Sequence, residues 1–282
     1  MAPLFISELH DRPAADGSVL RALGVGVFVC FWCVLWGMWA TLFGCLRCAG
    51  LARFGFHVWA RGILHAAGVR VEVTRRAALE NEKPYVFMSN HQSALDIPIL
   101  FAALMPAHDL RFMAKESLFK IPIFGWGMWA TGFIPIRRDS ARHSAELLQE
   151  LTKAPRPQPL SLSQEEGGGQ PQPKSALKFS YVVFPEGTRS PDGRLQPLKR
   201  GAVGLALRLG LPVAPVTIVD AARANPKGRF RLSGGTVRVV VHEAIGIETG
   251  AAGRAQRDEM IARIHAAIDS ALPEDQRAGV GA

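Results

Sequence analysis

The sequence places a histidine and a carboxylate five positions apart, as His91 and Asp96 in the segment NHQSALD. Histidine, with an unperturbed pKa of about 6.5, can take a proton at neutral pH, and an adjacent carboxylate can fix its tautomer and stabilise the imidazolium. The pair therefore predicts a general base with its orienting group. A structural hydrogen bond at a strand end is the alternative. Ser93 is a further candidate, as a nucleophile, but it lacks a G-x-S-x-G setting and suits a helix cap equally well.

The spacing of the pair predicts its local structure. On a regular helix, two side chains five positions apart would point about 140° apart, since each residue advances about 100°. We therefore expect His91 on a turn that precedes a helix. Pro98 favours this arrangement, because proline disfavours helical geometry at Ile97. The apolar run YVFMS before the segment reads as a buried strand, and α/β folds display reactive groups on loops at strand ends.

A second candidate segment is FPEGTRS, residues 184–190. The strand-like run YVVF enters it, and Pro185 with Gly187 predicts a turn. The turn would present Glu186 and Arg189 near the strand end, and the planar fork of arginine suits a phosphate. A surface ion pair between Glu186 and Arg189 is the alternative.

Three other cationic residues are candidates for phosphate binding: Lys115, Arg137 and Lys199. Arg137 ends the strand-like run FIPIR, and we expect Arg138 to point the other way, because side chains alternate along a strand. Either lysine could instead be a solvated surface residue.

Length and charge bound what these residues can act on. The chain has 282 residues, of which 48% are hydrophobic, and a formal net charge of +9. This length suits one large α/β domain or two small ones, and the charge favours anionic partners: nucleic acid, acidic lipid headgroups or phosphorylated substrates. The basic residues are scattered and no nucleic-acid-binding motif is present, so we expect no nucleic-acid partner.

The N-terminal region contains 25 consecutive residues without a charge, from Ala22 to Leu46. About 20 apolar residues suffice to cross a hydrocarbon core, and tryptophans such as Trp36 favour membrane interfaces. We predict a membrane-embedded helical segment over residues 1–67. It is either a single span or a re-entrant hairpin, because Gly37 and Gly44 leave room for a break.

Four cysteines lie in this region, as Cys30-x-x-Cys33 and Cys45-x-x-Cys48. On a continuous helix Cys30 and Cys45 would lie about 22 Å apart, too far to share one ion. We therefore predict no metal site, unless the segment folds back on itself. The slight excess of arginines after the apolar run places the body of the protein in the cytoplasm.

From Val69 onward the pattern predicts an α/β domain over residues 68–282. The expected strands are VRVEVT, YVFMS, LRFMA, FIPIR, YVVF, VAPVTI and TVRVVVH, and the expected helices lie near Leu95–Leu104, Ser140–Leu151, Ala202–Leu209 and Arg254–Leu272. This alternation indicates a mixed, partly parallel sheet covered by helices on both faces. Residues 154–176, rich in Pro, Gly, Gln and Ser, are predicted to form a flexible insertion.

Another uncharged stretch, IPIFGWGMWATGFIPI, covers residues 121–136. Its prolines and glycines make it too short and too broken for a span. It could wall an acyl-chain pocket, dip into the bilayer or belong to the core.

The chain resembles the lysophosphatidic acid acyltransferase family, the 1-acyl-sn-glycerol-3-phosphate acyltransferases, and in particular its bacterial members. The residues that carry the resemblance are NHQSALD, KESLFKIPIFGW, GFIPIRRD, FPEGTRS and VAPVTI, in that order over Tyr85 to Ile218. The Pro/Gly-rich insertion departs from the family pattern, where a short connection is expected.

The resemblance implies transfer of an acyl group from acyl-CoA or acyl carrier protein to the sn-2 hydroxyl of lysophosphatidic acid, giving phosphatidic acid. It assigns His91 and Asp96 to catalysis and Arg189 to the acceptor phosphate, with Glu186 and Gly187 positioning the glycerol end. Thr188, Arg137 and Lys115 complete the substrate-binding set.

It further implies a fold like that of the glycerolphosphate acyltransferases, no cofactor besides the acyl-donor substrate, membrane lipids as partners, and a place at the inner membrane with the catalytic domain on the cytoplasmic face. The competing functions are acylation of a different lyso-lipid, hydrolysis of the thioester, and anionic-lipid binding without catalysis.

Overall fold

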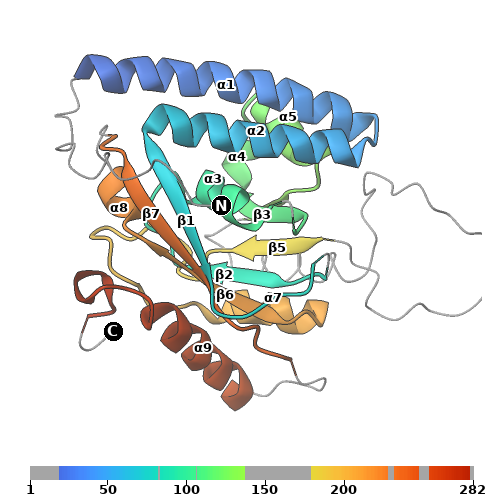
Figure 1. Cartoon of the computed structure of the whole chain (residues 1–282). Coiled ribbons are helices and arrows are strands. Elements are labelled where there is room, and N and C mark those ends of the chain that lie inside the picture. Colours follow the sequence, from blue (N-terminus) through green and yellow to red (C-terminus); the bar gives the residue numbers. More distant parts are fainter. Residues whose placement is uncertain are drawn as a thin grey trace, which may run out of the picture.

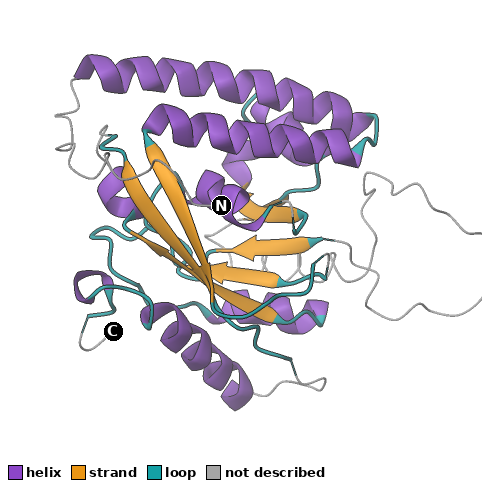
Figure 2. Cartoon of the chain, in the orientation of Figure 1, coloured by secondary structure: helices purple, strands orange, loops and turns teal. Residues whose placement is uncertain are grey.

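The computed structural model describes residues 19–81, 83–105, 107–136, 179–227, 232–247 and 254–279. Its centre is a seven-stranded sheet in the order β1-β7-β6-β2-β5-β3-β4. Every neighbouring pair is parallel except β6 and β7. The expected mixed, partly parallel sheet is thus confirmed, and most of its strand pairs are parallel (Figures 1 and 2).

The seven strands coincide with the seven apolar runs of the sequence. They are β1 (Val69–Arg75), β2 (Val86–Ser89), β3 (Leu110–Lys115), β4 (Ile134–Ile136), β5 (Ser180–Val183), β6 (Val213–Val219) and β7 (Gly235–Val241). The central strands β2, β5 and β6 are buried along their whole length. Strands buried on both faces show continuous apolar runs, which is why the sequence signal was clear.

Helices cover both faces of the sheet. They are α1 (Val19–Cys45), α2 (Ala49–Ala67), α3 (Asp96–Leu104), α4 (Glu116–Phe119), α5 (Phe124–Ala130), α7 (Arg200–Leu209), α8 (Ala221–Ala224), α9 (Arg254–Asp269) and the 3-10 turn η2 (Glu274–Gln276). Figure 1 shows α1 and α2 side by side over one face, with α9 at the other. The helices expected near Leu95–Leu104, Ala202–Leu209 and Arg254–Leu272 are confirmed.

Two hydrophobic clusters fill the space between helices and sheet. Phe87 of β2 faces the cluster under α2 and α3, whereas Val86 and Met88 face the cluster under α7 and α9. This alternation follows from the two-residue period of a strand. It fixes the register of β2 and therefore the point at which the His91 segment leaves the sheet.

Four predictions fall outside the described residues. These are the helix near Ser140–Leu151, the insertion at 154–176, the position of Arg137 and the direction of Arg138.

The N-terminal apolar segment forms one continuous helix, α1, that turns back into α2. Its tryptophans lie over glycines of α2: a Cβ added to Gly55 would lie 2.5 Å from Trp39, and one added to Gly62 would lie 2.3 Å from Trp32. The indole of Trp32 donates to the Trp59 carbonyl oxygen at 3.1 Å. The hairpin therefore consists of α1 and α2 together, held by large side chains against small ones.

Gly37 and Gly44 do not break α1, contrary to the expectation that left room for a break there. They lie where α5 crosses it: an added Cβ would be 3.2 Å from Ile123 and 2.8 Å from Ala130, respectively. A Cβ added to Gly127 of α5 would lie 2.9 Å from the Gly37 carbonyl oxygen. The glycines serve close helix packing, whose contacts outweigh their low helix propensity.

A continuous apolar surface remains exposed on this side of the molecule. Leu23 to Cys45 is long and apolar enough to cross a membrane, and only 11% of its most apolar 18-residue stretch is buried inside the protein. The large exposed side chains on α1, α2, α5 and the segment before α5 are Leu23, Val27, Phe28, Phe31, Val34, Leu35, Met38, Leu42, Leu51, Phe54, Ile121, Trp126 and Trp129. Exposed apolar side chains in this number mark an interaction surface, and α1 is a candidate membrane segment.

The predicted domain boundary at residues 67 and 68 falls between α2 and β1. Ala60, Ile63, Leu64 and Ala67 of α2 nevertheless belong to the same buried cluster as Phe101 of α3. The α2 helix is thus part of the wall that supports the sheet.

Candidate active site

The structure brings His91 and Asp96 together at the carboxyl end of β2. The imidazole Nδ1 lies 2.7 Å from Asp96 Oδ2, and both side chains are buried. His91 occupies the loop after β2, and Asp96 is the first residue of α3. The turn expected before the helix is confirmed, since it allows the two side chains to meet.

The reason offered for that turn is wrong. Ile97 is helical, and Pro98 lies in the first turn of α3. The first backbone N–H groups of a helix have no acceptor within the helix, so proline is tolerated there.

Asp96 holds the loop as well as the ring. Its Oδ2 accepts hydrogen bonds from the backbone N–H groups of Gln92 at 2.7 Å and Ser93 at 2.9 Å. A carboxylate that accepts these bonds requires the Nδ1–H tautomer of His91, which leaves Nε2 with a free lone pair. The arrangement is that of a general base oriented through its other nitrogen.

The ring of His91 stacks on Phe184, the first residue of FPEGTRS. The centroids lie 4.0 Å apart and the planes meet at 14°. His91 retains 8% of its surface exposed. The flat contact fixes the plane of the imidazole that Asp96 orients.

Two hydrogen bonds of the His91 backbone, one to a side chain and one to a backbone group, join FPEGTRS to the His91 loop. The His91 N–H donates to Glu186 Oε1 at 2.8 Å, and the Ser190 N–H donates to the His91 carbonyl oxygen at 2.7 Å. The motif thus braces both sides of the His91 peptide. The structure therefore places Glu186 against His91, and only 3% of this residue is exposed.

Burial raises the pKa of the Glu186 carboxyl group to about 8, with a smaller contribution from the negative charge of Asp96. Among the described residues, its Oε2 is buried without a hydrogen-bond partner. A carboxyl group in such surroundings favours its neutral form at pH 7.

The rest of the turn faces solvent. Thr188 is exposed and Arg189 is half-buried. Glu186 and Arg189, both described, form no ion pair, so the alternative of a surface ion pair between them is wrong. The Arg189 carbonyl oxygen accepts a hydrogen bond from Lys227 Nζ.

Gly187 adopts φ +77°, and an added Cβ would lie 2.8 Å from Lys199 Nζ. The φ value is one that glycine adopts without strain. Lys199 therefore lies directly beside the turn.

Lys115 is exposed at the end of β3, beside Ile136 of β4 in the sheet register. Because β2, β3 and β5 are parallel, Lys115 lies at the same end of the sheet as His91 and Glu186, the end where these strands have their carboxyl termini. Val213 to Ile218 is the buried strand β6 and belongs to the core.

Ser93 is committed to the loop. Its hydroxyl group donates to the Asn225 carbonyl oxygen at 3.1 Å and accepts the Leu95 N–H at 3.2 Å, and the residue is fully buried. These bonds occupy the hydroxyl group and disfavour the nucleophile. The helix-cap alternative is wrong, because the N-cap residue of α3 is Leu95 and no side chain among the described residues caps this helix.

Sequence reasoning missed two residues that flank His91. Asn90 forms paired hydrogen bonds with the backbone of Ile218, each 2.8 Å long. The Gln92 amide donates to the Gly193 carbonyl oxygen at 2.8 Å. Polar residues on both sides of a histidine after a buried strand were the available signal, since a buried amide needs partners.

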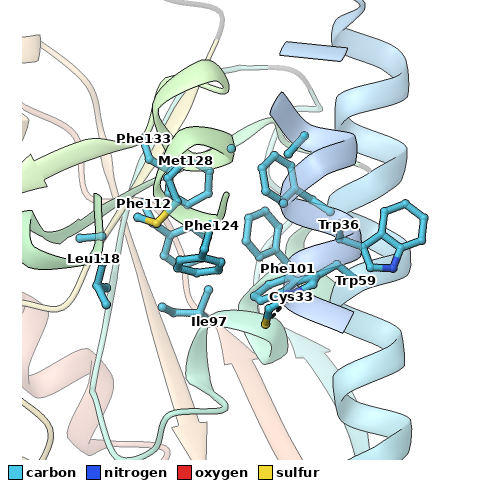
Figure 3. Close-up of a pocket in the computed structure, with 15 residues that line it drawn as sticks. Cys33, Trp36, Trp59, Ile97, Phe101, Phe112, Leu118, Phe124, Met128 and Phe133 are labelled. Atoms are coloured by element: carbon cyan, nitrogen blue, oxygen red, sulfur yellow. Dashed lines mark hydrogen bonds between the residues drawn. The ribbon is translucent and has the colours of Figure 1, made fainter. Parts of the chain in front are cut away.

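Two apolar cavities lie between the N-terminal hairpin and the sheet. The aromatic cavity, of about 70 Å³, is drawn in Figure 3, where Phe112, Phe124 and Phe133 converge from different elements. The larger cavity measures about 370 Å³. Four residues line both cavities: Cys33, Trp59, Ile97 and Phe124.

Their walls connect to the candidate site. Ala94 and Leu95, from the His91 loop, line the larger cavity. Phe124, Gly127, Met128 and Phe133 line the aromatic one, so residues 121–136 form a cavity wall as well as core. Within the described ranges, no group of three His, Cys, Asp or Glu side chains could hold a metal ion, and the four cysteines are free.

Comparison with known proteins gives one consistent result. A family model described as Acyltransferase matches residues 70–219. The chain is 36% identical over 169 residues to the chloroplastic 1-acyl-sn-glycerol-3-phosphate acyltransferase BAT2 of Brassica napus, covering 58% of this chain and 42% of that protein. It is 32% identical over 195 residues to the 1-acyl-sn-glycerol-3-phosphate acyltransferase of Pseudomonas aeruginosa, covering 68% of this chain and 65% of that protein.

A solved structure shares the fold. The crystal structure of the 1-acyl-sn-glycerophosphate (LPA) acyltransferase PlsC from Thermotoga maritima aligns with a TM-score of 0.65 and 22% identity, covering 89% of this chain and 94% of that one. The chain spans only 40% to 50% of the length of the plant and algal relatives it matches.

Proposed function

The chain belongs to the acyltransferase family, and from this premise we propose that it transfers a fatty acyl group from a thioester to the sn-2 hydroxyl of 1-acyl-sn-glycerol-3-phosphate. The product is phosphatidic acid, made for phospholipid biosynthesis. The observation that carries the proposal is the 2.7 Å contact between His91 and Asp96, braced by the FPEGTRS turn. The shared names of the relatives support the choice of substrate.

The reaction uses the free Nε2 of His91. This nitrogen takes the proton of the acceptor hydroxyl as its oxygen attacks the thioester carbonyl, and a tetrahedral intermediate forms. Asp96 stabilises the imidazolium. When the intermediate collapses, the carbon–sulfur bond breaks and the imidazolium returns the proton to the thiolate that leaves. The acyl group passes directly between substrates, which agrees with the buried, hydrogen-bonded state of Ser93.

The acceptor phosphate binds to cationic side chains near His91, at the carboxyl ends of the parallel strands. Arg189 supplies a bidentate contact, and Lys115 and Lys199 add positive charge. Arg137, which lies outside the described residues, is a further phosphate ligand in this proposal. Gly187 and Thr188 form the turn against which the glycerol end lies. Glu186 acts from behind this turn, through the His91 peptide.

The larger cavity accepts an acyl chain. Its walls are apolar, and they begin at Ala94, three residues beyond the base. The acyl donor is acyl-CoA or acyl carrier protein, which present the same kind of thioester. No further cofactor takes part.

Membrane association follows from the exposed apolar surface of α1, α2 and α5. The hairpin brings the lipid-facing side of the protein next to both cavities, so that lyso-lipid reaches the site from the bilayer. We place the protein at the inner membrane, with the sheet on the cytoplasmic face.

The test is acyl transfer by purified protein in detergent micelles. Labelled acyl-CoA and labelled acyl carrier protein are each supplied with and without lysophosphatidic acid, and phosphatidic acid and free fatty acid are measured. We expect phosphatidic acid with at least one donor, and only when the acceptor is present. Fatty acid release without acceptor would instead indicate a hydrolase, and acylation of only another lyso-lipid would refute the proposed acceptor.

A further inference from the structure

A glutamine far from both motifs reaches the candidate active site from the C-terminal end of the chain. Gln276 lies on η2, beyond the residues 70–219 that match the family model. Although η2 is a short surface turn, Gln276 is only 4% exposed. A buried amide is retained only where its hydrogen bonds are satisfied.

Gln276 joins three separate segments. Its Oε1 accepts hydrogen bonds from Gln92 Nε2 at 3.1 Å and from the Asp220 N–H at 3.2 Å. Its Nε2 donates to Asp220 Oδ1 at 2.6 Å. Its carbonyl oxygen accepts the Leu195 N–H at 2.9 Å. The turn thus connects the His91 loop, the segment after FPEGTRS and the end of β6.

The contact with Gln92 leads directly to the base. Gln92 is 1% exposed, and its side-chain amide is fixed between Gln276 and the Gly193 carbonyl oxygen. Its backbone N–H donates at 2.7 Å to Asp96 Oδ2, the same oxygen that contacts His91 Nδ1. Holding the Gln92 side chain therefore holds the peptide that aims the carboxylate.

The contact with Asp220 provides a second route to the same loop. Asp220 adopts φ +69°, a conformation that is uncommon for a residue other than glycine. Gln276 bonds both its N–H and its carboxylate. The next helix, α8, ends before Asn225, whose carbonyl oxygen accepts the Ser93 hydroxyl group. Both routes end within five residues of His91.

We propose that Gln276 is a positioning residue for the His91–Asp96 pair, acting through Gln92. This inference rests on the proposed function, because it assigns Gln276 to the orientation of the general base. The alternative is that Gln276 only anchors the C-terminal turn, in which case its loss would affect stability without affecting turnover by the folded protein.

Kinetics of three variants separate these roles. Gln276→Leu should lower kcat by about 10-fold to 100-fold with little change in KM, because small displacements of a catalytic group are costly. Gln92→Leu should have a similar effect. If Gln276 acts through Gln92, the double variant should be no slower than the slower single variant. Rates are corrected for the folded fraction measured by circular dichroism.

The matched control is Asp275→Ala. Asp275 lies on the same turn and forms an exposed ion pair with Arg223, 2.7 Å long. Its loss should leave kcat unchanged. An unchanged kcat in Gln276→Leu, or effects of Gln92→Leu and Gln276→Leu that multiply in the double variant, would overturn the inference.

A measurement that needs no activity keeps this inference separate from the proposed function. In protein with ¹⁵N-labelled histidine, the Nδ1–H resonance of His91 is assigned by its loss in His91→Gln. It should persist in Asp275→Ala and disappear in Gln276→Leu through faster exchange with water. If it persists in Gln276→Leu, the inference fails. If the wild-type protein makes no phosphatidic acid, the proposed function fails, whatever the resonance shows.

Discussion

His91 and His242 are both buried histidines held by one side-chain oxygen, but only one of them is arranged as a base. His91 is 8% exposed and contacts Asp96 Oδ2 at 2.7 Å. His242, after β7, is 4% exposed and its Nε2 contacts Thr217 Oγ1 at 2.8 Å. Burial and contact distance therefore do not distinguish them. The chemistry of the partner does.

The partner determines which nitrogen keeps its lone pair. The Thr217 hydroxyl group has one proton, and it donates this proton to the Ile268 carbonyl oxygen at 3.0 Å. It can only accept from His242, so Nε2 of His242 carries the proton. In His91 the carboxylate accepts from Nδ1 instead, and Nε2 is free. A carboxylate also stabilises the imidazolium that proton transfer creates, which a hydroxyl group cannot do.

The largest effect should come from replacing each histidine in turn. His91→Gln should lower kcat for acyl transfer by about 10³-fold, within the range that general-base catalysis contributes. His242→Gln should leave kcat unchanged, because its ring contacts Thr217, whose hydroxyl group is bound to α9 and not to the His91 loop. Initial rates with saturating acceptor provide the measurement. Equal losses in the two variants would show that both act through folding alone.

A smaller loss should follow when the carboxylate of the first pair becomes an amide. Asp96→Asn keeps an oxygen that accepts from Nδ1 but removes the charge that stabilises the imidazolium. We expect a decrease in kcat of about 10²-fold. Initial rates with saturating acceptor test it. A kcat equal to that of the wild-type protein would exclude the orienting role of Asp96.

The sequence predicted this comparison only in part. His91 and Asp96 are close in the chain, so their pairing could be proposed from residue chemistry, and helix geometry then predicted the turn that lets them meet. The bond between His91 and Glu186 joins residues 95 positions apart, and that between Gln92 and Gln276 joins residues 184 positions apart. Such contacts depend on how the strands and the C-terminal turn assemble, which residue spacing does not encode.

The fold was more predictable than the packing. Seven apolar runs became seven strands. The central strands β2, β5 and β6 are buried on both faces and show continuous apolar runs, whereas β1 and β7 alternate between more buried and more exposed residues. Gly37 and Gly44 show the opposite case. Glycine both weakens helices and allows close contact between them, and only the position of α5 decides which effect prevails.

The smallest effect should appear in the pH dependence of stability. Burial, with a further contribution from Arg76, lowers the pKa of His242 from 6.5 to about 4. The unfolded chain therefore binds a proton between these pH values that the folded protein does not, so stability falls as pH decreases through this window. The loss between pH 7 and pH 5 should be about 2 kcal/mol in the wild-type protein and absent in His242→Gln. Denaturant unfolding in detergent at each pH gives the slope.

Glu186 provides a control, because its titration changes stability with pH in the opposite direction. Its pKa is raised from 4.5 to about 8, so the folded protein binds the extra proton and stability falls as pH increases from 4.5 toward 8. In Glu186→Gln, the loss of stability between pH 5 and pH 8 should be smaller than in the wild-type protein by about 3 kcal/mol. The glutamine side-chain oxygen still accepts the His91 N–H. His242→Gln must leave this second slope intact. If one substitution removed both slopes, the two groups would not titrate independently, and His242 could not be treated as separate from the site that contains His91.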